Sequence, residues 1–461
     1  EIAQTHPEKF TRPERFAFCS VHKTPTISCF CSVLFNILRI IPTVKVKALV
    51  FLNSYDRMAG VFQRPVGMGR EWEMMYMETM MGEQKQIGMR EVNATRAFFF
   101  IGGFGSASWA PLVPLLRERL AIGDDMLGLL LLCIGVGSLL TMPLSGALSA
   151  RLGCRRVLIA AGVIYAAVLL SICFVDSFWI AVPVILFFGA LMGCIDVVIN
   201  IAAVIVEKGI GRRIMSGMHG FWSFGGFVGA GLYGVWVGLF GLTAFQSTAI
   251  AAAIVLLLTE IFGSRLIPYG GGGGALIAIP RGIVVFVGVT AFIAFLSEGA
   301  MMDWSGVYLT TVRGMDLSLA GMGFSVFSAA MLLMRFLGDR VVQRIGQCPV
   351  AVGGALLTFA GILLVMFAPV DALLYLGFFA IGIGSANIVP VFFSLMGRQN
   401  VMPIGTAVSA VSTMGYLGIL AGPAAIGFVS ALTNLQTAFG MLAALSLLQA
   451  LVGFYVFRKM V

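Results

Sequence analysis

Charged residues are scarce in this chain. They make up 11% of its 461 residues, and hydrophobic residues make up 59%, whereas an ordinary soluble domain is about 25% charged. So little charge over such a length predicts a polytopic membrane protein rather than a large soluble core. The net charge of +9 would suggest a nucleic-acid partner in a soluble protein. Here the basic residues fall mostly in short loops between apolar segments, where they set topology in a lipid bilayer, so we expect no nucleic-acid partner.

Patterns that hold metals, nucleotides or covalent intermediates are also missing. The eight cysteines lack the paired spacing that binds zinc, so we expect no metal site. The sequence has no phosphate-binding loop of the P-loop form, which argues against ATP-driven transport. The apolar segments hold no serine–histidine–aspartate constellation, so we expect no enzyme, no catalytic residue and no cofactor.

A long internal repeat is the strongest positive signal. Features of the first half recur in the same order in the second: Trp109 as Trp304, Gly128 as Gly321, Arg151-Leu152-Gly153 as Arg344-Ile345-Gly346, and Gly193-x-x-Asp196 as Gly384-x-x-Asn387. A repeat of this length in an apolar chain is typical of transporters built from two membrane halves that enclose a site at their interface.

Twelve apolar segments of spanning length predict an all-α membrane protein with twelve transmembrane helices in two six-helix halves. The segments are 97–116, 126–149, 156–175, 178–206, 217–240, 242–262, 281–310, 317–341, 348–369, 371–396, 402–430 and 433–457. We expect the N-terminal half at 96–262 and the C-terminal half at 281–461. A linker at 263–280 joins them, and its five consecutive glycines are typical of a flexible tether or spacer.

Residues 1–95 differ from the rest in composition, which changes abruptly at Arg96. The apolar stretch at 28–44 is shorter than the roughly 20 residues that a span needs. Methionine is frequent from Met68 to Met89. Our hypothesis is that much of 1–88 lies upstream of the true start or forms a poorly ordered extension.

The distribution of basic residues predicts the orientation in the membrane. The side with more basic residues is expected to face the cytoplasm, and it carries both termini and the linker. The opposite side has only Arg117, Arg119 and Arg313. The other side has Arg151, Arg155, Arg156, Lys208, Arg212, Arg213, Arg265, Arg281, Arg340, Arg344, Arg398, Arg458 and Lys459.

The loop after the second segment reads Gly146-Ala-Leu-Ser-Ala-Arg-Leu-Gly-Cys-Arg-Arg156. It resembles the signature loop of the major facilitator superfamily, Gly-x-Leu-x-Asp-Arg-x-Gly-Arg-Arg, with Ala150 at the aspartate position. Gly338-Asp339-Arg340…Arg344-x-Gly346 is a looser copy in the second half. The resemblance implies transport by alternating access and a monomer.

Shorter motifs give a finer resemblance. Gly193-Cys-Ile-Asp-Val-Val-Ile-Asn200 and Gly384-x-x-Asn387-x-x-Pro390 resemble the fourth and tenth helices of fucose–proton symporters. Three further pieces resemble YbjJ-type bacterial inner-membrane transporters, which implies that location: Ser108-Trp-Ala-Pro111, Glu298-Gly-Ala-Met-Met-Asp-Trp304 and Gly422-Pro-Ala-Ala-Ile-Gly427. Fucose symporters carry a carboxylate on the first helix, and segment 97–116 has none. The fucose mechanism therefore does not transfer directly.

Asp196 is the foremost candidate for proton coupling or substrate contact. It lies deep in an apolar segment with Asn200 one helical turn along on the same face. An ionised side chain in mid-membrane costs several kcal/mol, from about 2.5 upward, so it needs a reason. A carboxyl group in apolar surroundings holds its proton more firmly than in water, as a proton-coupled carrier requires. The alternative is a neutral aspartic acid bonded to a neighbouring helix.

Glu298 and Asp303 on the seventh segment are the next candidates. Five residues apart, they fall on different faces unless the helix is broken, and Gly299 and Gly306 favour such a break. Glu298 would then supply the carboxylate that the first segment lacks. Asp303 lies nearer the outer end, where a solvated rim residue is the alternative.

Several polar and aromatic residues are candidates with structural alternatives. Asn387 can bond a hydroxylated substrate or another helix. Trp109 and Trp304 can stack on a sugar ring or sit at the membrane interface. His219 opens the fifth segment near Arg213, where a boundary residue is the alternative to a proton relay.

We expect a cytoplasmic gate at the signature loops. Arg335 and Asp339 are four residues apart, which favours a pair between them. The hypothesis is that they close the cytoplasmic face in the outward-open state together with Arg151, Arg155 and Arg340.

Small residues recur on the fifth and eleventh segments, as Gly225-xxx-Gly229 and Gly418-xxx-Gly422. This spacing lets helices approach closely in lipid. It serves either sliding of the halves or static packing.

Together these features predict a secondary active transporter that moves a small, polar, sugar-like solute by alternating access with proton coupling. One alternative is a drug or metabolite exporter of the same fold. Others are a non-transporting membrane sensor and a lipid flippase.

Overall fold

The computed structural model describes residues 87–272, 277–316, 319 and 321–460. The predicted extension up to residue 86, with its apolar stretch at 28–44, lies outside the described residues. Within the described ranges the chain is helical apart from turns and short connections. The first described helix begins at Met89, upstream of residue 97, where the sequence placed the first span.

The helices form two sets of similar make-up. The first set, called the N half, contains α4 (Met89–Trp109), α5 (Leu112–Leu120), α6 (Asp124–Leu152), α7 (Cys154–Ser171), the 3-10 turn η1 (Ile172–Phe174), α8 (Phe178–Ile210), α9 (Met215–Gly238) and α10 (Ala244–Gly263). The second, called the C half, contains α11 (Ile283–Val307), the π-helical turn η2 (Tyr308–Val312), α12 (Met322–Ile345), α13 (Gln347–Phe367), α14 (Asp371–Ser385), α15 (Ile388–Met396), α16 (Ile404–Leu432) and α17 (Leu435–Met460).

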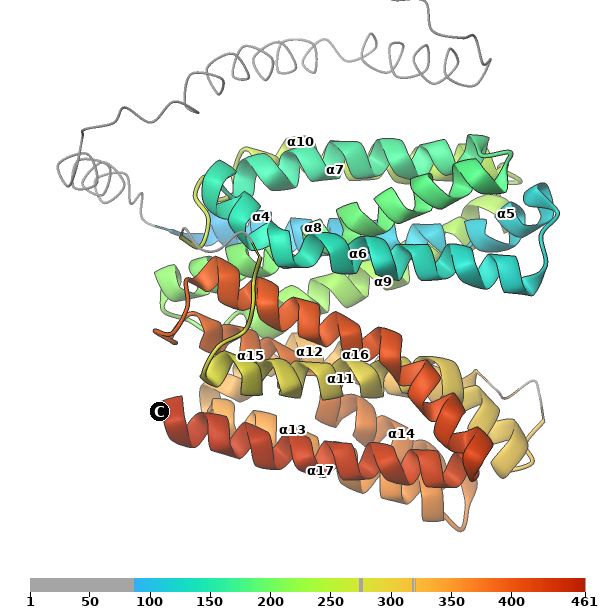
Figure 1. The fold of residues 1–461 in the computed structure, drawn as a ribbon, viewed down its shortest axis with the longest axis vertical. Helices are drawn as coiled ribbons and strands as arrows, with labels where there is room; N and C mark the ends of the chain where they lie inside the picture. The colour runs from blue at the N-terminus through green and yellow to red at the C-terminus, as the bar shows by residue number, and fades with distance from the viewer. Residues whose placement is uncertain (1–86, 273–276, 317–318, 320, 461) are drawn as a thin grey trace, which may run out of the picture. The chain divides into compact units, whose positions relative to one another are not determined.

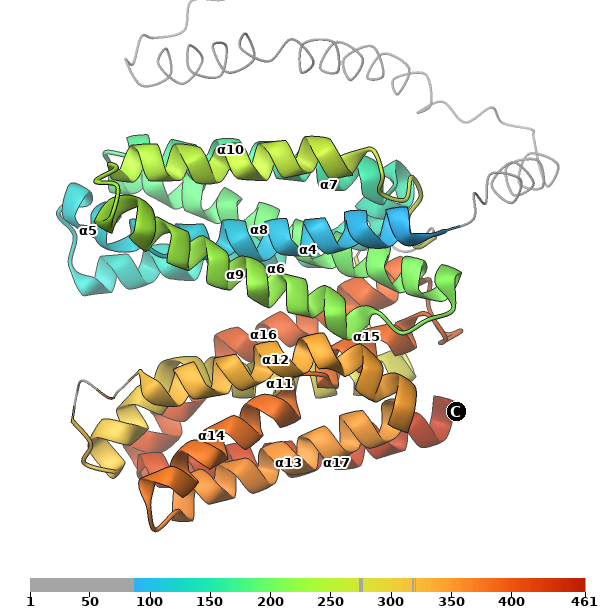
Figure 2. The ribbon, with the colours of Figure 1, turned by 180° about the vertical axis from the view of Figure 1, so that it is seen from behind.

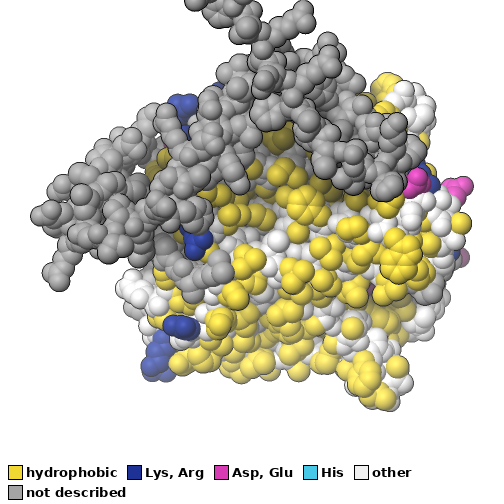
Figure 3. Space-filling model, turned by 45° about the horizontal axis from the view of Figure 1, so that its top comes forward, with side chains coloured by type: hydrophobic (Ala, Val, Ile, Leu, Met, Phe, Trp, Pro, Cys, Tyr) yellow, Lys and Arg dark blue, Asp and Glu magenta, His cyan; other side chains and the backbone are white. Residues whose placement is uncertain are grey.

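The helices are suited to cross a bilayer. Among the described residues, eleven helical stretches are long and apolar enough to span. Helix α9 is a further crossing of 24 residues, and its many glycines together with His219 and Trp222 give it a lower hydropathy. Hydrophobic side chains cover the face of the bundle that Figure 3 shows. The predicted class, an all-α membrane protein, is confirmed.

The two halves lie side by side, with α4–α10 above and α11–α17 below in Figures 1 and 2. The beginning of α4 and the C-terminus lie at the same end of the bundle, on the left in Figure 1. The connections α6–α7, α8–α9 and α12–α13 also lie at this end, because successive helices alternate in direction. Arg213 lies in the α8–α9 connection, and Arg151 and Arg344 lie in the last turns of α6 and α12. We call this end of the bundle the basic end.

The glycine pairs on α9 and α16 pack within each half. A Cβ atom at Gly225 would lie 2.3 Å from the carbonyl oxygen of Phe100 on α4. In the repeat, a Cβ at Gly418 would lie 2.1 Å from the carbonyl oxygen of Phe292 on α11. Only glycine permits such backbone contact. Of the two roles considered for these motifs, the structure therefore favours packing over sliding of the halves.

The halves meet through α6 against α16 and α9 against α12. Helices α6 and α16 lie side by side in Figure 1, and α9 and α12 in Figure 2. Near the basic end the approach is close, since a Cβ at Gly146 would lie 2.6 Å from the carbonyl oxygen of Gly405. The small side chains of the first signature loop therefore bring α6 onto the C half.

The sequence predicted a helix break in the seventh span, but the structure has the break in another span. Helix α11 runs without interruption through Gly299 and Gly306, so that prediction is wrong. A Cβ at Gly299 would lie 3.2 Å from Ile419 of α16, so this glycine serves close packing. The tenth span is divided instead, into α14 and α15, at Ala386 and Asn387.

The first part of the linker is bound to the N half. Its carbonyl groups at Ile267 and Tyr269 accept the backbone N–H groups of Arg155 and Cys154. The Arg155 guanidinium donates to the carbonyl oxygen of Leu266, with Nε at 2.8 Å. The stretch 264–269, which we call the linker strap, is therefore held against the N half by hydrogen bonds. The prediction of a flexible tether came from the glycine run that follows it.

Candidate functional site

The centre of the site is the Arg335 side chain on α12. It is only 6% exposed, and its Nη2 lies 3.4 Å from Oε2 of Glu298 on α11. Its Nη1 donates to Ser223 Oγ on α9 at 2.5 Å. The guanidinium therefore joins an ion pair within the C half to a hydrogen bond across the two halves.

The interrupted tenth span supplies a further acceptor. Since the helix ends at Ser385 and resumes at Ile388, carbonyl groups near the break are free of the usual helical bonds. The carbonyl oxygen of Ala386 accepts from Arg335 Nε at 3.4 Å. A helix break thus takes part in the site, as in many carriers.

Asn387 holds this break against α12. Its Nδ2 donates to the carbonyl oxygen of Met334 at 3.2 Å, while its Oδ1 is buried without a hydrogen-bond partner. A Cβ at Gly338 would lie 2.1 Å from that Oδ1. The amide therefore makes the helix-to-helix bond that was one of its two predicted roles, and one buried acceptor is left over.

Asp196 and Asn200 form a second cluster at the middle of α8. Asn200 Nδ2 donates to the Asp196 carbonyl oxygen at 2.9 Å and to its Oδ1 at 3.3 Å. Asp196 is half-buried and Asn200 is buried, with its Oδ1 lacking a hydrogen-bond partner. Tyr416 of α16 lies within electrostatic reach of the Asp196 carboxyl. The Tyr416 side chain is thus the group of the C half that lies toward this cluster.

His219 is buried between aromatic rings of both halves. Its ring centroid lies 5.4 Å from Phe99 and 5.9 Å from Phe393, the latter stacked at 23°. Its Nε2 has no hydrogen-bond partner, and Arg335 lies within electrostatic reach. It is therefore an interface residue between the halves rather than a solvated boundary residue.

The two tryptophans pack inside their own halves. Trp304 Nε1 donates to the carbonyl oxygen of Pro423 on α16 at 3.2 Å. Trp109 is 8% exposed and lies 5.8 Å, centroid to centroid, from Phe188. Asp303 is exposed. The structure brings none of these three into contact with the Arg335 cluster.

Asp339 links the halves at the basic end. Its Oδ2 accepts the backbone N–H of Gly217 at 3.0 Å, within the first turn of α9, where a carboxylate is favoured by the helix dipole. The expected pair between Arg335 and Asp339 is not formed, because Arg335 points to Glu298. Gln343 Nε2 adds a bond to the carbonyl oxygen of Arg213 at 3.1 Å.

The other predicted gate residues have different surroundings. Arg155 binds the linker strap, and Arg151 and Arg340 are exposed. The cross-half bonds at this end thus come from an aspartate, a glutamine and backbone groups.

Two residues of the site escaped the sequence argument. Ser223 and Tyr416 are ordinary polar residues in apolar segments, and only the packing of α9 on α12 and of α16 on α8 shows their partners. Ser223 lies among small residues on the fifth segment. Such residues indicate a helix face that packs closely on another helix, so this pattern could have identified Ser223.

Comparison with known proteins identifies the fold family. The family model for the Major Facilitator Superfamily matches residues 97–283 and again 283–460. The chain belongs to the major facilitator superfamily. An uncharacterized MFS-type transporter of Yersinia pestis is 46% identical over 367 residues, which cover 78% of this chain and 94% of the relative.

Solved structures agree on the fold. A variant of the Escherichia coli fucose:proton symporter FucP superposes with a TM-score of 0.67 at 17% identity, over 80% of this chain and 98% of that chain. The proton:xylose symporter XylE gives 0.64 at 14% identity, over 81% of this chain and 96% of that chain. The predicted superfamily is confirmed. This multi-pass membrane transporter is not an enzyme, and like other superfamily members it binds small-molecule substrates.

Proposed function

We propose that this transporter carries a small, polar, sugar-like solute by alternating access, coupled to protons, through a site between Asp196 and the Arg335–Glu298 pair. The observation that carries the proposal is the presence of ionisable and amide groups near the middle of one long helix in each half. Asp196 lies near the middle of the 33-residue helix α8, and Arg335 near the middle of the 24-residue helix α12. Charged groups there cost about 2.5–3.5 kcal/mol each on insertion scales, so their presence points to function.

The donors and acceptors of the site suit a hydroxylated solute. Asn200 and Asn387 each keep a buried amide oxygen without a partner, and such an oxygen accepts a hydroxyl hydrogen. The Arg335 guanidinium has five N–H donors in a fixed fork. Three of them bond to Ala386, Ser223 and Glu298, which leaves two for a solute. A solute with several hydroxyl groups can bond to these groups without carrying a charge of its own.

The two carboxyl groups are suited to different tasks. Glu298 already has a cation at 3.4 Å, so its charge is balanced and it orients the guanidinium. The hydrogen-bond donor to Asp196 is the neutral amide of Asn200. Loading Asp196 with a proton therefore breaks no ion pair, which makes it the proposed proton carrier. We assign Asp303, Trp109 and Trp304 to the rim and walls of the pathway.

The basic end is the proposed cytoplasmic end, because an excess of arginine and lysine in short loops marks that side. Both termini of the superfamily core then lie on the cytoplasmic side of a bacterial inner membrane. Asp339 and Gln343 join the halves at that end, which supports the proposal that this state is closed to the cytoplasm. We propose that Asp339 is the gate residue and that the transporter works as a monomer.

Proton movement in proteoliposomes tests the proposal. Vesicles that carry a pH-sensitive dye would receive sugars, polyols, sugar acids and drugs from outside, with wild type compared with Asp196→Asn and Glu298→Gln. The matched control is Asp176→Asn, an exposed aspartate in the connection before α8. We expect a solute-dependent proton flux in wild type and the control, and none in Asp196→Asn.

Two results would contradict the proposal. Solute uptake without proton flux in wild type would remove proton coupling. Flux that responds only to large hydrophobic drugs would favour an exporter and remove the sugar-like substrate class.

A further inference from the structure

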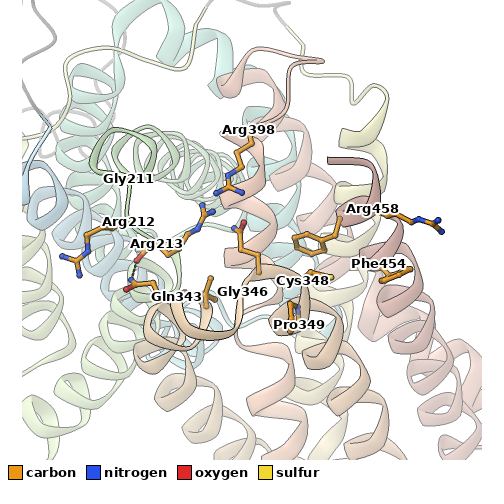
Figure 4. A pocket seen from close by; sticks show the side chains of 13 residues that line it. Gly211, Arg212, Arg213, Gln343, Gly346, Cys348, Pro349, Arg398, Phe454 and Arg458 are labelled. Carbon is orange, nitrogen blue, oxygen red and sulfur yellow. Dashed lines mark hydrogen bonds between the residues drawn. The ribbon is translucent and has the colours of Figure 1, made fainter. Parts of the chain in front are cut away.

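A pocket of about 890 Å³ opens at the basic end, away from the mid-membrane site. Its walls come from both halves, as Figure 4 shows. The N half contributes the α8–α9 connection with Arg213. The C half contributes the α12–α13 connection, Arg398 after α15, and Phe457 near the end of α17.

The charge of the pocket has one sign. The thirteen described lining residues include Arg212, Arg213, Arg398 and Arg458, and none of the thirteen is acidic. In Figure 4 the side chains of Arg213 and Arg398 point toward each other, one from each half, while Arg212 and Arg458 point away. Two guanidinium groups that converge without an intervening carboxylate repel each other unless an anion lies between them.

The carboxylate that pairs with Arg213 has other partners as well. Glu207 lies 3.3 Å from Arg213 Nη1 and accepts the backbone N–H groups of Ile214 and Met215 at 2.9 and 3.0 Å. This ion pair engages one terminal nitrogen of the Arg213 guanidinium and orients that group. The remaining guanidinium donors of Arg213 and the whole guanidinium of Arg398 are left for a ligand.

A buried donor inside the pocket points independently to a ligand. Gln347 lines the pocket and is only 8% exposed, yet its Nε2 has no hydrogen-bond partner. Gln347 is also the first residue of α13, a helix of 21 residues. The free N–H groups at such a helix start and the helix dipole favour a negative charge. A buried amide donor without an acceptor costs free energy that an anion oxygen would recover.

We propose that this pocket binds a phosphate-bearing anion between Arg213, Arg398 and Gln347, and that the bound anion favours the state closed at the basic end. Guanidinium, amide and helix-start donors together suit a group with several charged oxygens. The phosphate belongs either to a soluble metabolite or to a lipid headgroup, since Phe454 and Phe457 form an apolar wall beside the arginines. Because the anion contacts both halves, it binds the closed state better and shifts the population toward it.

Thermal unfolding of the purified protein in nanodiscs tests the proposal. One arm adds inorganic pyrophosphate to nanodiscs of pure phosphatidylcholine. The other arm compares those nanodiscs with nanodiscs that also contain phosphatidylglycerol. A rise in the wild-type melting temperature in the first arm indicates a soluble phosphate, and a rise only in the second indicates a lipid headgroup.

The variants are Arg398→Gln and Gln347→Leu, with Arg344→Gln as the matched control. Arg344 is exposed on the end of α12 and does not line the pocket, so its replacement removes the same charge nearby. We expect Arg398→Gln to weaken binding of the effective probe about tenfold or more, the size expected for a charge-assisted hydrogen bond. The control keeps the wild-type affinity.

Native mass spectrometry of the wild type keeps the test decisive if a variant fails to fold. We expect one bound pyrophosphate or phosphatidylglycerol per chain. The proposal is overturned if neither probe stabilises or adds to the wild type. It is also overturned if Arg398→Gln, Gln347→Leu and the control all bind as the wild type does. These outcomes are independent of the proposed function, since none of them reads proton or solute movement.

Discussion

At the scale of single residues, the main feature is a guanidinium held at mid-membrane by three elements. Arg335 contacts Glu298 on α11, Ser223 on α9 and the carbonyl oxygen of Ala386 at the break between α14 and α15. Because a buried cation in a membrane-spanning helix is costly, we propose that Arg335 binds substrate or organises groups that do. The same contacts make it sensitive to the relative position of the halves.

Replacement of Arg335 by leucine leaves the Glu298 carboxylate without its cation. Breaking a buried ion pair by removing one partner costs about 3–5 kcal/mol in soluble proteins. Because Glu298 is 29% exposed, we expect a smaller but measurable fall in melting temperature in detergent. The double variant Arg335→Leu/Glu298→Gln removes both charges and should melt closer to the wild type while remaining inactive. Equal melting temperatures for the single and double variants would show that the two side chains are not coupled.

The candidate residues of the site could be predicted from the sequence more easily than their partners. Asp196 and Glu298 are carboxylates in apolar segments, and the insertion cost alone marks them. The pair between Glu298 and Arg335 spans 37 positions and depends on how α11 and α12 pack. Sequence spacing favoured Asp339 as the partner of Arg335, since four residues make one helical turn. The structure shows that tertiary contacts decide the pairing.

At the scale of elements, paired glycines let each half pack as a unit. Gly225 on α9 and Gly418 on α16 meet the backbones of α4 and α11, respectively. Because these contacts lie within the halves, motion between the halves has to occur elsewhere, at α6–α16 and α9–α12.

Alanine substitution at two glycines of α9 separates the effect of helix–helix contact from the effect of helix propensity. A Cβ at Gly225 would lie 2.3 Å from the carbonyl oxygen of Phe100, whereas one at Gly231 would meet nothing within 4 Å. We expect Gly225→Ala to destabilise the protein by about 1–3 kcal/mol through overpacking. Gly231→Ala should be neutral or stabilising by up to about 1 kcal/mol from helix propensity. Unfolding in a denaturing detergent measures both, and the same sign for both variants would contradict the packing described.

Hydropathy located the helices because spanning length and low charge leave few alternatives. It was weakest for α9, whose glycines and His219 lower its score although it lies at the interface between the halves. The break expected from Gly299 and Gly306 was wrong, because glycine serves both flexibility and close contact. The actual break at Ala386–Asn387 has two local signals. One is an asparagine in an apolar segment, which fits a substrate contact as well. The other is Pro390, which lacks the N–H that would bond the Ala386 carbonyl group.

At the scale of the whole molecule, the basic end is closed by specific bonds between the halves. Asp339 caps the start of α9, and Gln343 reaches the carbonyl oxygen of Arg213. Phe221 of α9 and Phe336 of α12 meet beside them, 5.8 Å apart.

Neutralising Asp339 should open this end. A cysteine introduced at Ser409 reports the opening, because Ser409 is fully buried on α16 beside Gly146. We expect Asp339→Asn to increase labelling of Ser409→Cys by a membrane-permeant maleimide, since the amide binds the helix start less strongly than a carboxylate. Asp371→Asn, which alters a carboxylate paired with Arg313 at 3.9 Å at the opposite end, is the control. Equal labelling in both backgrounds, after subtraction of the native cysteines, would remove Asp339 from the gate.

The proposed orientation has its own test. A green fluorescent protein fused after Val461 should fluoresce in bacterial cells, because the fusion partner folds in the cytoplasm. A fusion of alkaline phosphatase at the same position should be inactive, since that enzyme needs an oxidising compartment. The opposite pattern would place the basic end outside.

A hydrogen bond next to the linker strap offers a measure of how often the basic end opens. The Gly405 amide, on the C half, donates to the carbonyl oxygen of Gly271 in the linker at 3.3 Å, next to the stretch bound by Arg155. We expect this hydrogen bond to break when the basic end opens, so that the amide hydrogen becomes free to exchange with deuterium. The exchange rate at that one backbone position would then count how often an unmodified transporter turns toward the cytoplasm, without a dye, a label or a known substrate.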